Sequence, residues 1–136
     1  MNNTDAMTVG IADLLRSELE HCADWPTSRL LGWVRWFVVK QRYLVSVRDG
    51  ELVGAALLRY VDSEADCRED YRDTGGKICY VDATVATQPD VLKEMYTQMW
   101  NRFGKDCDLI AWVRPKHNDK IICVPMDKAR RRLIKE

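Results

Sequence analysis

The fold of this chain is decided by residues 77–103, which read KICYVDATVATQPDVLKEMYTQMWNRF. The first part, Lys77–Ala86, alternates in the manner of a β-strand, with Asp82 as the carboxylate on its polar face. From Val91 onwards, apolar side chains recur at helical spacing and predict an amphipathic helix. A second apolar run, Asp108–Val113, follows this helix. The stretch therefore predicts a strand–helix–strand unit whose two strands are parallel.

The turn before this helix, Thr87-Gln88-Pro89-Asp90, carries the signals of a helix start. Thr87 belongs to a residue type that caps helices, and Asp90 stands three positions later, where a capping box places an acid. Pro89 is compatible with the first turn of a helix. We therefore expect the helix to begin within this turn.

Two helices are predicted ahead of the unit. Thr8–Cys22 carries apolar side chains at helical spacing and reads as one amphipathic helix. Pro26 prevents a helix from running straight through the preceding residue. A second helix is therefore expected to start near Asp24 or Trp25 and to continue to about Val38.

A β-hairpin is predicted next. Tyr43–Arg48 and Leu52–Tyr60 alternate on either side of Asp49-Gly50. An Asp-Gly pair between two such runs favours a type I′ turn, which needs positive φ at both central residues. The acidic and polar stretch Asp62–Gly76 then reads as a loop that is long for a compact domain, and is either mobile or functional.

The chain ends with a short strand, Ile121–Val124, and a basic helix or tail, Met126–Glu136. The order of elements predicts an α+β (mixed α/β) fold with a sheet of about five strands. Residues 1–136 are long enough for a single domain with one core.

The composition narrows the class of protein. Lys+Arg and Asp+Glu both number 21, so net charge gives no reason to expect nucleic acid as a partner. The five cysteines stand singly and without zinc spacing, which indicates reduced thiols and no metal site. No apolar run approaches the roughly 20 residues of a membrane span, and the N-terminus does not resemble a signal peptide. We therefore expect a cytoplasmic protein.

Two residues are candidates for acid–base chemistry. Asp82 lies inside a strand, where an acid is disfavoured, and could act as a base or orient a histidine. Alternatively, Asp82 faces solvent or pairs with an arginine such as Arg48 or Arg59. His21 could be a base at neutral pH, or a histidine that is favoured by the dipole at the end of its helix.

Basic residues near the C-terminus form a candidate partner-binding surface. They could dock an acidic carrier protein or nucleic acid, whereas the simpler interpretation is a solvated charged tail. The residues expected to contact a partner are Lys116, Lys120, Arg130, Arg131 and Arg132.

The order of elements resembles the GNAT acyltransferase fold over most of the chain. GNAT enzymes hold the coenzyme A pyrophosphate on a glycine-rich loop between the central strand and helix, whereas Thr87–Asp90 contains no glycine. The resemblance places an acyl donor beside Val85, Thr87 and Gln88. It implies an acyl thioester as co-substrate, with no tightly bound cofactor.

Four stretches carry a narrower resemblance: His21 with Trp25-Pro26, Lys40–Leu44 with Arg48-Asp49-Gly50, Tyr80-Val81-Asp82, and Arg114-Pro115-Lys116. Through them the sequence looks most like the toxin-activating lysine acyltransferases, which take a fatty acyl chain from acyl carrier protein to lysines of RTX toxins. The family's catalytic histidine and aspartate fall on His21 and Asp82. The resemblance thus predicts acyl transfer from a carrier-borne thioester to a protein lysine or other amine, and the alternative is a non-catalytic GNAT-like binding protein.

Overall fold

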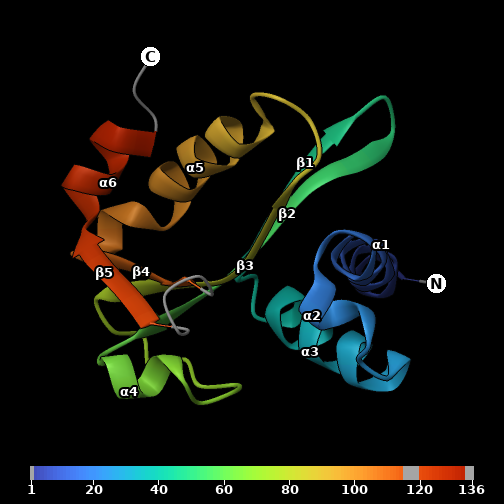
Figure 1. Ribbon diagram of the computed structural model, residues 1–136, viewed down its shortest axis with the longest axis horizontal. Coiled ribbons are helices and arrows are strands. Elements are labelled where there is room, and N and C mark those ends of the chain that lie inside the picture. The colour runs from blue at the N-terminus through green and yellow to red at the C-terminus, as the bar shows by residue number, and fades with distance from the viewer. Residues whose placement is uncertain (1, 115–119, 134–136) are drawn as a thin grey trace. The chain divides into compact units, whose positions relative to one another are not determined.

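The computed structural model describes residues 2–114 and 120–133. Its sheet has five strands in the order β1-β2-β3-β4-β5, with helices before, between and after them (Figure 1). The elements are α1 Asn3–Glu18, α2 Glu20–Ala23, α3 Thr27–Val39, β1 Tyr43–Arg48, β2 Glu51–Val61, α4 Glu64–Cys67, β3 Ile78–Ala86, α5 Val91–Arg102, the 3-10 turn η1 Gly104–Asp106, β4 Leu109–Arg114, β5 Lys120–Pro125 and α6 Met126–Leu133.

The residues group into two compact units. Unit 1 comprises Met1–Leu57 with Ala83–Met95, and unit 2 comprises Leu58–Asp82 with Tyr96–Glu136. Three elements, β2, β3 and α5, each contribute residues to both units.

Unit 1 has its core between the N-terminal helices and the strands. Leu15 of α1, Phe37 of α3 and Leu57 of β2 are all buried in one apolar cluster. The cluster is completed by Ala83 and Val85, which β3 contributes. The predicted amphipathic stripes of the helices therefore face the sheet, as the helical spacing indicated.

The first predicted helix is wrong in its extent. Instead of Thr8–Cys22, α1 begins after Asn2, whose side chain accepts a hydrogen bond from the Asp5 N–H at 2.8 Å, and it ends at Glu18. Leu19 is extended, and a separate short helix, α2, follows it. Arg16 stabilises this turn, because its guanidinium donates to the carbonyls of Ala23 and Trp25, both at 3.0 Å.

The predicted hairpin is confirmed. β1 and β2 pair antiparallel, and both Asp49 and Gly50 have positive φ, at 54° and 80°. The register shifts between Ser46 and Val47, which places a bulge in the hairpin. The second predicted helix is also present as α3, although it begins at Thr27, after Pro26.

The central helix is present as α5 and begins at Val91, where the predicted apolar stripe starts, but the predicted cap is wrong. Thr87 does not cap it, because its hydroxyl and its N–H both donate to the carbonyl of Val53, at 3.0 and 2.9 Å. Asp90 adopts a left-handed φ of 71°, and α5 begins only at Val91. The bonds to β2 thus outweigh the local capping preference of Thr87.

Unit 2 contains the parallel part of the sheet. β3 and β4 pair in parallel at Ile78↔Leu109, Cys79↔Ile110 and Tyr80↔Ala111, which confirms the strand–helix–strand prediction. Both strands continue past these positions, but the described residues form no further pairs between them. β4 pairs antiparallel with β5 from Leu109↔Pro125 to Arg114↔Lys120.

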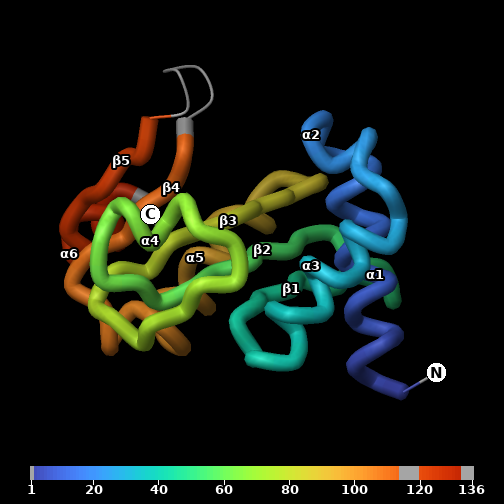
Figure 2. The backbone as a smooth tube through the Cα atoms, turned by 90° about the horizontal axis from the view of Figure 1, so that it is seen from below, coloured from blue at the N-terminus to red at the C-terminus, as the bar shows by residue number. Residues whose placement is uncertain are grey.

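Helices cover both faces of the sheet within unit 2 (Figures 1 and 2). On one face, Cys67 at the end of α4 packs in a cluster with Tyr80, Ala111 and Ile121. On the other, the ring of Tyr60 lies 6.0 Å from that of Phe103, just after α5. The predicted polar face of β3 is therefore covered, because the Asp62–Gly76 loop includes α4 and folds over it.

Candidate functional site

Asp82 lies on β3 in unit 2 and is bound by an arginine. Both of its carboxylate oxygens accept hydrogen bonds from Nε of Arg59, at 3.1 and 2.8 Å. The two side chains are only 8% and 3% exposed. Of the alternatives that the sequence left open for Asp82, pairing with Arg59 is the one that the structure contains.

The charges of this pair influence each other. Burial raises the pKa of Asp82 to about 6, even though the bond and charge of Arg59 oppose the shift. Burial also acts to lower the pKa of Arg59, but the hydrogen bond and charge of Asp82 outweigh it and raise that pKa. Both directions leave the pair ionised at neutral pH. The carboxylate of Asp82 is therefore ionised and already accepts hydrogen bonds from the Arg59 cation.

Arg59 also binds backbone of the loop that covers β3. Its Nη2 donates to the carbonyl of Cys67 at 2.7 Å. Its Nη1 contacts the carbonyls of Asp66, Glu69 and Arg72. Sequence reasoning mentioned Arg59 only as a partner of Asp82. The signal for a larger role was a lone arginine within the apolar strand Leu57–Val61, since a buried charge must be paired.

Two further titratable groups surround the pair. Burial raises the pKa of Tyr80 to about 12, with the charge of Asp82 as the next cause. Burial likewise raises the pKa of the Cys67 thiol to about 11. Arg59 also lies 5.2 Å from the Tyr80 ring centroid. Neither group is therefore an activated nucleophile at neutral pH.

His21 lies in unit 1, on α2, and is exposed. Its ring stands edge-on to Trp25, with centroids 6.4 Å apart. Asp82 belongs to unit 2. A joint catalytic role for His21 and Asp82 stays a prediction.

The predicted donor residues lie in unit 1 around the start of α5. Val85 is buried in the core, and Thr87 is bound to β2. Gln88 accepts a bond from Arg48 at 3.4 Å. Arg48 also pairs with Glu94 at 3.2 Å, on the first turn of α5.

Glu94 adds a second acid to this helix start. Ser46 donates to its carboxylate at 2.9 Å, and this bond, followed by that of Arg48, lowers the pKa of Glu94. With Asp90 just before the helix and Pro89 lacking an N–H, the start of α5 offers acids where a phosphate would need donors.

The predicted partner-binding residues lie in unit 2. Arg130, Arg131 and Arg132 are exposed on α6, and the guanidinium of Arg130 lies 4.8 Å from the Trp100 ring centroid. Lys120 is exposed at the start of β5. Lys116 lies outside the described residues.

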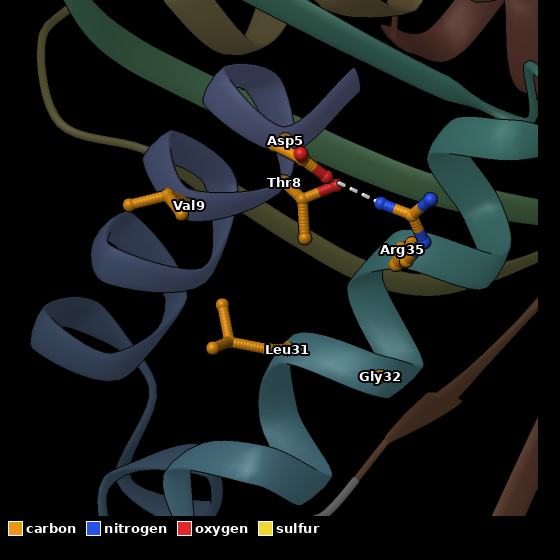
Figure 3. Close-up of a pocket in the computed structure, with 6 residues that line it drawn as sticks. All are labelled: Asp5, Thr8, Val9, Leu31, Gly32 and Arg35. Carbon is orange, nitrogen blue, oxygen red and sulfur yellow. Dashed lines mark hydrogen bonds and ion pairs between the residues drawn. The ribbon is translucent and has the colours of Figure 1, made fainter. Parts of the chain in front are cut away.

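A cavity of about 480 Å³ lies between α1 and α3 in unit 1 (Figure 3). Val9 and Leu31 line the space, and Asp5 and Arg35 form an ion pair beside it. None of the predicted site residues lines it.

Two kinds of site are absent from the described part of the chain. Residues 2–114 and 120–133 contain no group of three or more His, Cys, Asp or Glu side chains arranged to hold a metal ion. Within the same residues, no helix combines the length and the apolar character needed to cross a membrane.

Solved structures resemble this chain, although its sequence matches no protein-family model and no curated protein. The GNATL loading domain of CurA from Lyngbya majuscula superposes with a TM-score of 0.57 at 10% identity, over 79% of this chain and 60% of that one. The GphF GNAT-like decarboxylase, solved with isobutyryl-CoA, superposes with a TM-score of 0.58 at 14% identity, over 80% and 62%. The fold is GNAT-like. This chain spans about 60% of the length of these GNAT-like neighbours.

Proposed function

We propose that this protein is an acyltransferase, which moves an acyl group from a carrier-borne thioester to a protein lysine or other amine. The observation that carries the proposal is the short parallel pairing of β3 and β4, which ends at Tyr80 and Ala111 although both strands continue. Backbone groups of a strand that loses its neighbour inside a sheet need another partner.

An extended thioester arm supplies such a partner. The pantetheine arm of an acyl donor carries amide groups, and these can bond to an open strand as an added peptide strand does. The GNAT-like neighbour GphF, solved with isobutyryl-CoA, supports a thioester ligand for this fold. We therefore assign the donor arm to the part of β3 that lies in unit 1, beside Val85, Thr87 and Gln88.

The start of α5 favours a carrier protein over free coenzyme A as the donor. A pyrophosphate at a helix N-terminus needs backbone N–H donors and no opposing charge. Here Pro89 removes a donor, and Asp90 and Glu94 add two acids. The exposed arginines of α6 provide positive charge for docking an acidic carrier. These features agree with the toxin-activating lysine acyltransferases, the branch to which the sequence motifs point.

The proposed chemistry is removal of a proton from the attacking amine, whose ordinary pKa of about 10.4 keeps it charged at neutral pH. We assign this step to His21 as the base and Asp82 as its partner. A positioned base contributes roughly 10²–10⁴-fold to such a reaction. Asp82→Asn and His21→Ala are each expected to lower acyl transfer by that factor.

The test is acylation followed by mass spectrometry, with acyl carrier protein, long-chain acyl-CoA and acetyl-CoA as donors. Circular dichroism serves as the folding control for both variants. Transfer that is unchanged in both variants would remove these residues from the mechanism.

One observation favours a second function, that of a non-catalytic binding protein. Asp82 is buried and already holds Arg59 with both oxygens, so it has little freedom to take a proton from a substrate. The absence of transfer from every donor, together with a thermal shift by the acylated carrier, would establish the binding function.

A further inference from the structure

The segment Asp62–Gly76 in unit 2 is a closed loop whose two ends meet. The N–H and hydroxyl of Thr74 both donate to the carbonyl of Tyr60, at 2.8 and 3.4 Å. A Cβ added to Gly76 would lie 2.3 Å from the carbonyl oxygen of Val61. A compact loop of this length with adjoining ends is an Ω-loop.

A side chain that does not belong to the Ω-loop binds its backbone. Arg59, on β2, donates to four loop carbonyls, those of Asp66, Cys67, Glu69 and Arg72. Its charge is balanced from below by Asp82 on β3, at 2.8 Å. One guanidinium therefore satisfies four backbone carbonyls in the middle of the loop, between residues 66 and 72.

Short-range bonds make the loop a single body. The Asp66 carboxylate accepts from the N–H groups of Asp62 and Ser63, at 3.1 and 3.2 Å, and completes a capping box on α4. Its other oxygen accepts from Nε of Arg72 at 2.6 Å. The two sides of the loop are thus bonded to each other as well as to Arg59.

Apolar burial, by contrast, contributes little to holding the loop down. Cys67 is the buried apolar residue of the loop, and Asp66 is its buried polar one. The strands beneath it carry the fully buried Leu58, Val61 and Ile110. Segments with few apolar contacts open at a lower free energy than the core on which they lie.

We propose that Asp62–Gly76 is a lid that opens and closes as one cooperative unit, held shut by Arg59, while the rest of unit 2 stays folded. Release of Arg59 breaks its hydrogen bonds to four carbonyls at once, so a partly open loop is not a stable intermediate. Opening uncovers the apolar face formed by Tyr80, Ala111 and Ile121, together with the thiol of Cys67. This inference does not depend on the proposed acyl transfer.

The first test uses the unmodified protein. Native-state hydrogen exchange in low denaturant is measured for loop amides that are hydrogen-bonded, such as those of Arg68, Glu69 and Thr74. We expect them to share one opening free energy, lower than that of the β4 and β5 amides. Scattered values, or exchange of the loop only together with the strands, would overturn the proposal.

The second test replaces the residue that holds the lid. Arg59→Lys keeps the charge beside Asp82 but cannot reach four carbonyls, so the loop amides should exchange roughly tenfold faster or more. Global unfolding also releases Arg59, so strand amides should accelerate by no more than this factor, and the loop should still open at the lower free energy. Alkylation of Cys67 should accelerate by the same factor, while buried Cys22 serves as an internal control. Arg35→Lys, in the exposed pair with Asp5, is the matched control and should change neither rate. Equal exchange rates in the Arg59 and Arg35 variants would contradict the assignment to Arg59.

Discussion

At the scale of single residues, the Arg59–Asp82 pair explains why sequence reasoning could identify Asp82 but not its setting. A lone acid in a strand stands out in any sequence. Whether it faces solvent, a substrate or an arginine depends on side chains that are distant in the sequence, here by 23 positions. The four hydrogen bonds from Arg59 to loop carbonyls could not be predicted from the sequence, because the positions of these carbonyls depend on how the loop folds.

The pair gives a clear stability prediction. Arg59→Met should lower the free energy of unfolding by roughly 3–5 kcal/mol, because it leaves the buried carboxylate of Asp82 without its cation. Arg35→Met removes an arginine from a pair whose side chains are 52% and 44% exposed, and should cost less than about 1 kcal/mol. Urea unfolding of both variants measures the difference. Equal losses would show that burial of the Arg59 pair is unimportant.

Asp82 also predicts a pH dependence. Its folded pKa, raised by burial to about 6, exceeds the unfolded value of about 4, so the folded chain holds the proton more tightly. The contribution of Asp82 to stability therefore decreases as the pH rises through this range. Relative to Asp82→Asn, the wild type should lose up to roughly 3 kcal/mol of stability between pH 4 and pH 7.

Denaturant unfolding at several pH values tests this, and the comparison with Asp82→Asn removes other titrations. Asp66 and Glu94 have lowered pKa values, through their bonds to Arg72 and Ser46 respectively, and their contributions are lost as the pH falls. Both residues are present in the two proteins, so their effects cancel. A difference that stays constant with pH would mean that burial does not raise the pKa of Asp82.

At the scale of elements, the sequence predicted correctly those features that depend on neighbouring residues alone. The Asp49-Gly50 turn was predictable because its backbone angles are a property of those two residues. The break at Leu19 and the failure of Thr87 to cap α5 were not, because Arg16 and Thr87 donate hydrogen bonds to carbonyls of other segments. The preference of Thr87 for a capping position contributes less than its two hydrogen bonds to the neighbouring strand.

Two glycines provide a prediction about element packing. A Cβ on Gly54 of β2 would lie 2.5 Å from Val91 Cγ1 and 3.2 Å from the backbone oxygen of Val85, so Gly54→Ala should cost roughly 1–3 kcal/mol. Gly32 lies within α3 with no atom near its added Cβ, so Gly32→Ala should stabilise by about 0.5–1 kcal/mol. Thermal unfolding compares them. A neutral Gly54→Ala would mean that α5 can shift away from β2.

At the scale of the whole molecule, the order of elements was sufficient for the fold. An antiparallel hairpin followed by a strand–helix–strand unit leaves few arrangements of five strands, and the chain superposes on a solved GNAT-like domain with a TM-score of 0.57. The candidate site was harder to predict from the sequence than the fold. Pattern places Asp82 on a strand and His21 near a helix end, but whether they serve one reaction depends on distances that no periodicity encodes.

The donor prediction belongs to this scale, because it concerns how the fold would treat a whole cofactor. We expect weak or no binding of coenzyme A, since the start of α5 lacks glycine and presents Asp90 and Glu94 to the phosphates. Calorimetry with acetyl-CoA should give no saturable heat. The acylated carrier protein, titrated in the same buffer, is the comparison. A micromolar dissociation constant for acetyl-CoA would contradict the prediction.

The bulge between Ser46 and Val47 has a consequence for how copies of this protein coexist at high concentration. β1 is an outer strand of the sheet, and outer strands offer unpaired backbone groups on which another copy could grow a fibre. A bulge interrupts that template and increases the local twist. The strand at the opposite edge of the sheet, β5, begins with the charged Lys120 and ends with Pro125, which has no backbone N–H to donate. Both borders of the sheet thereby discourage aggregation through strand addition.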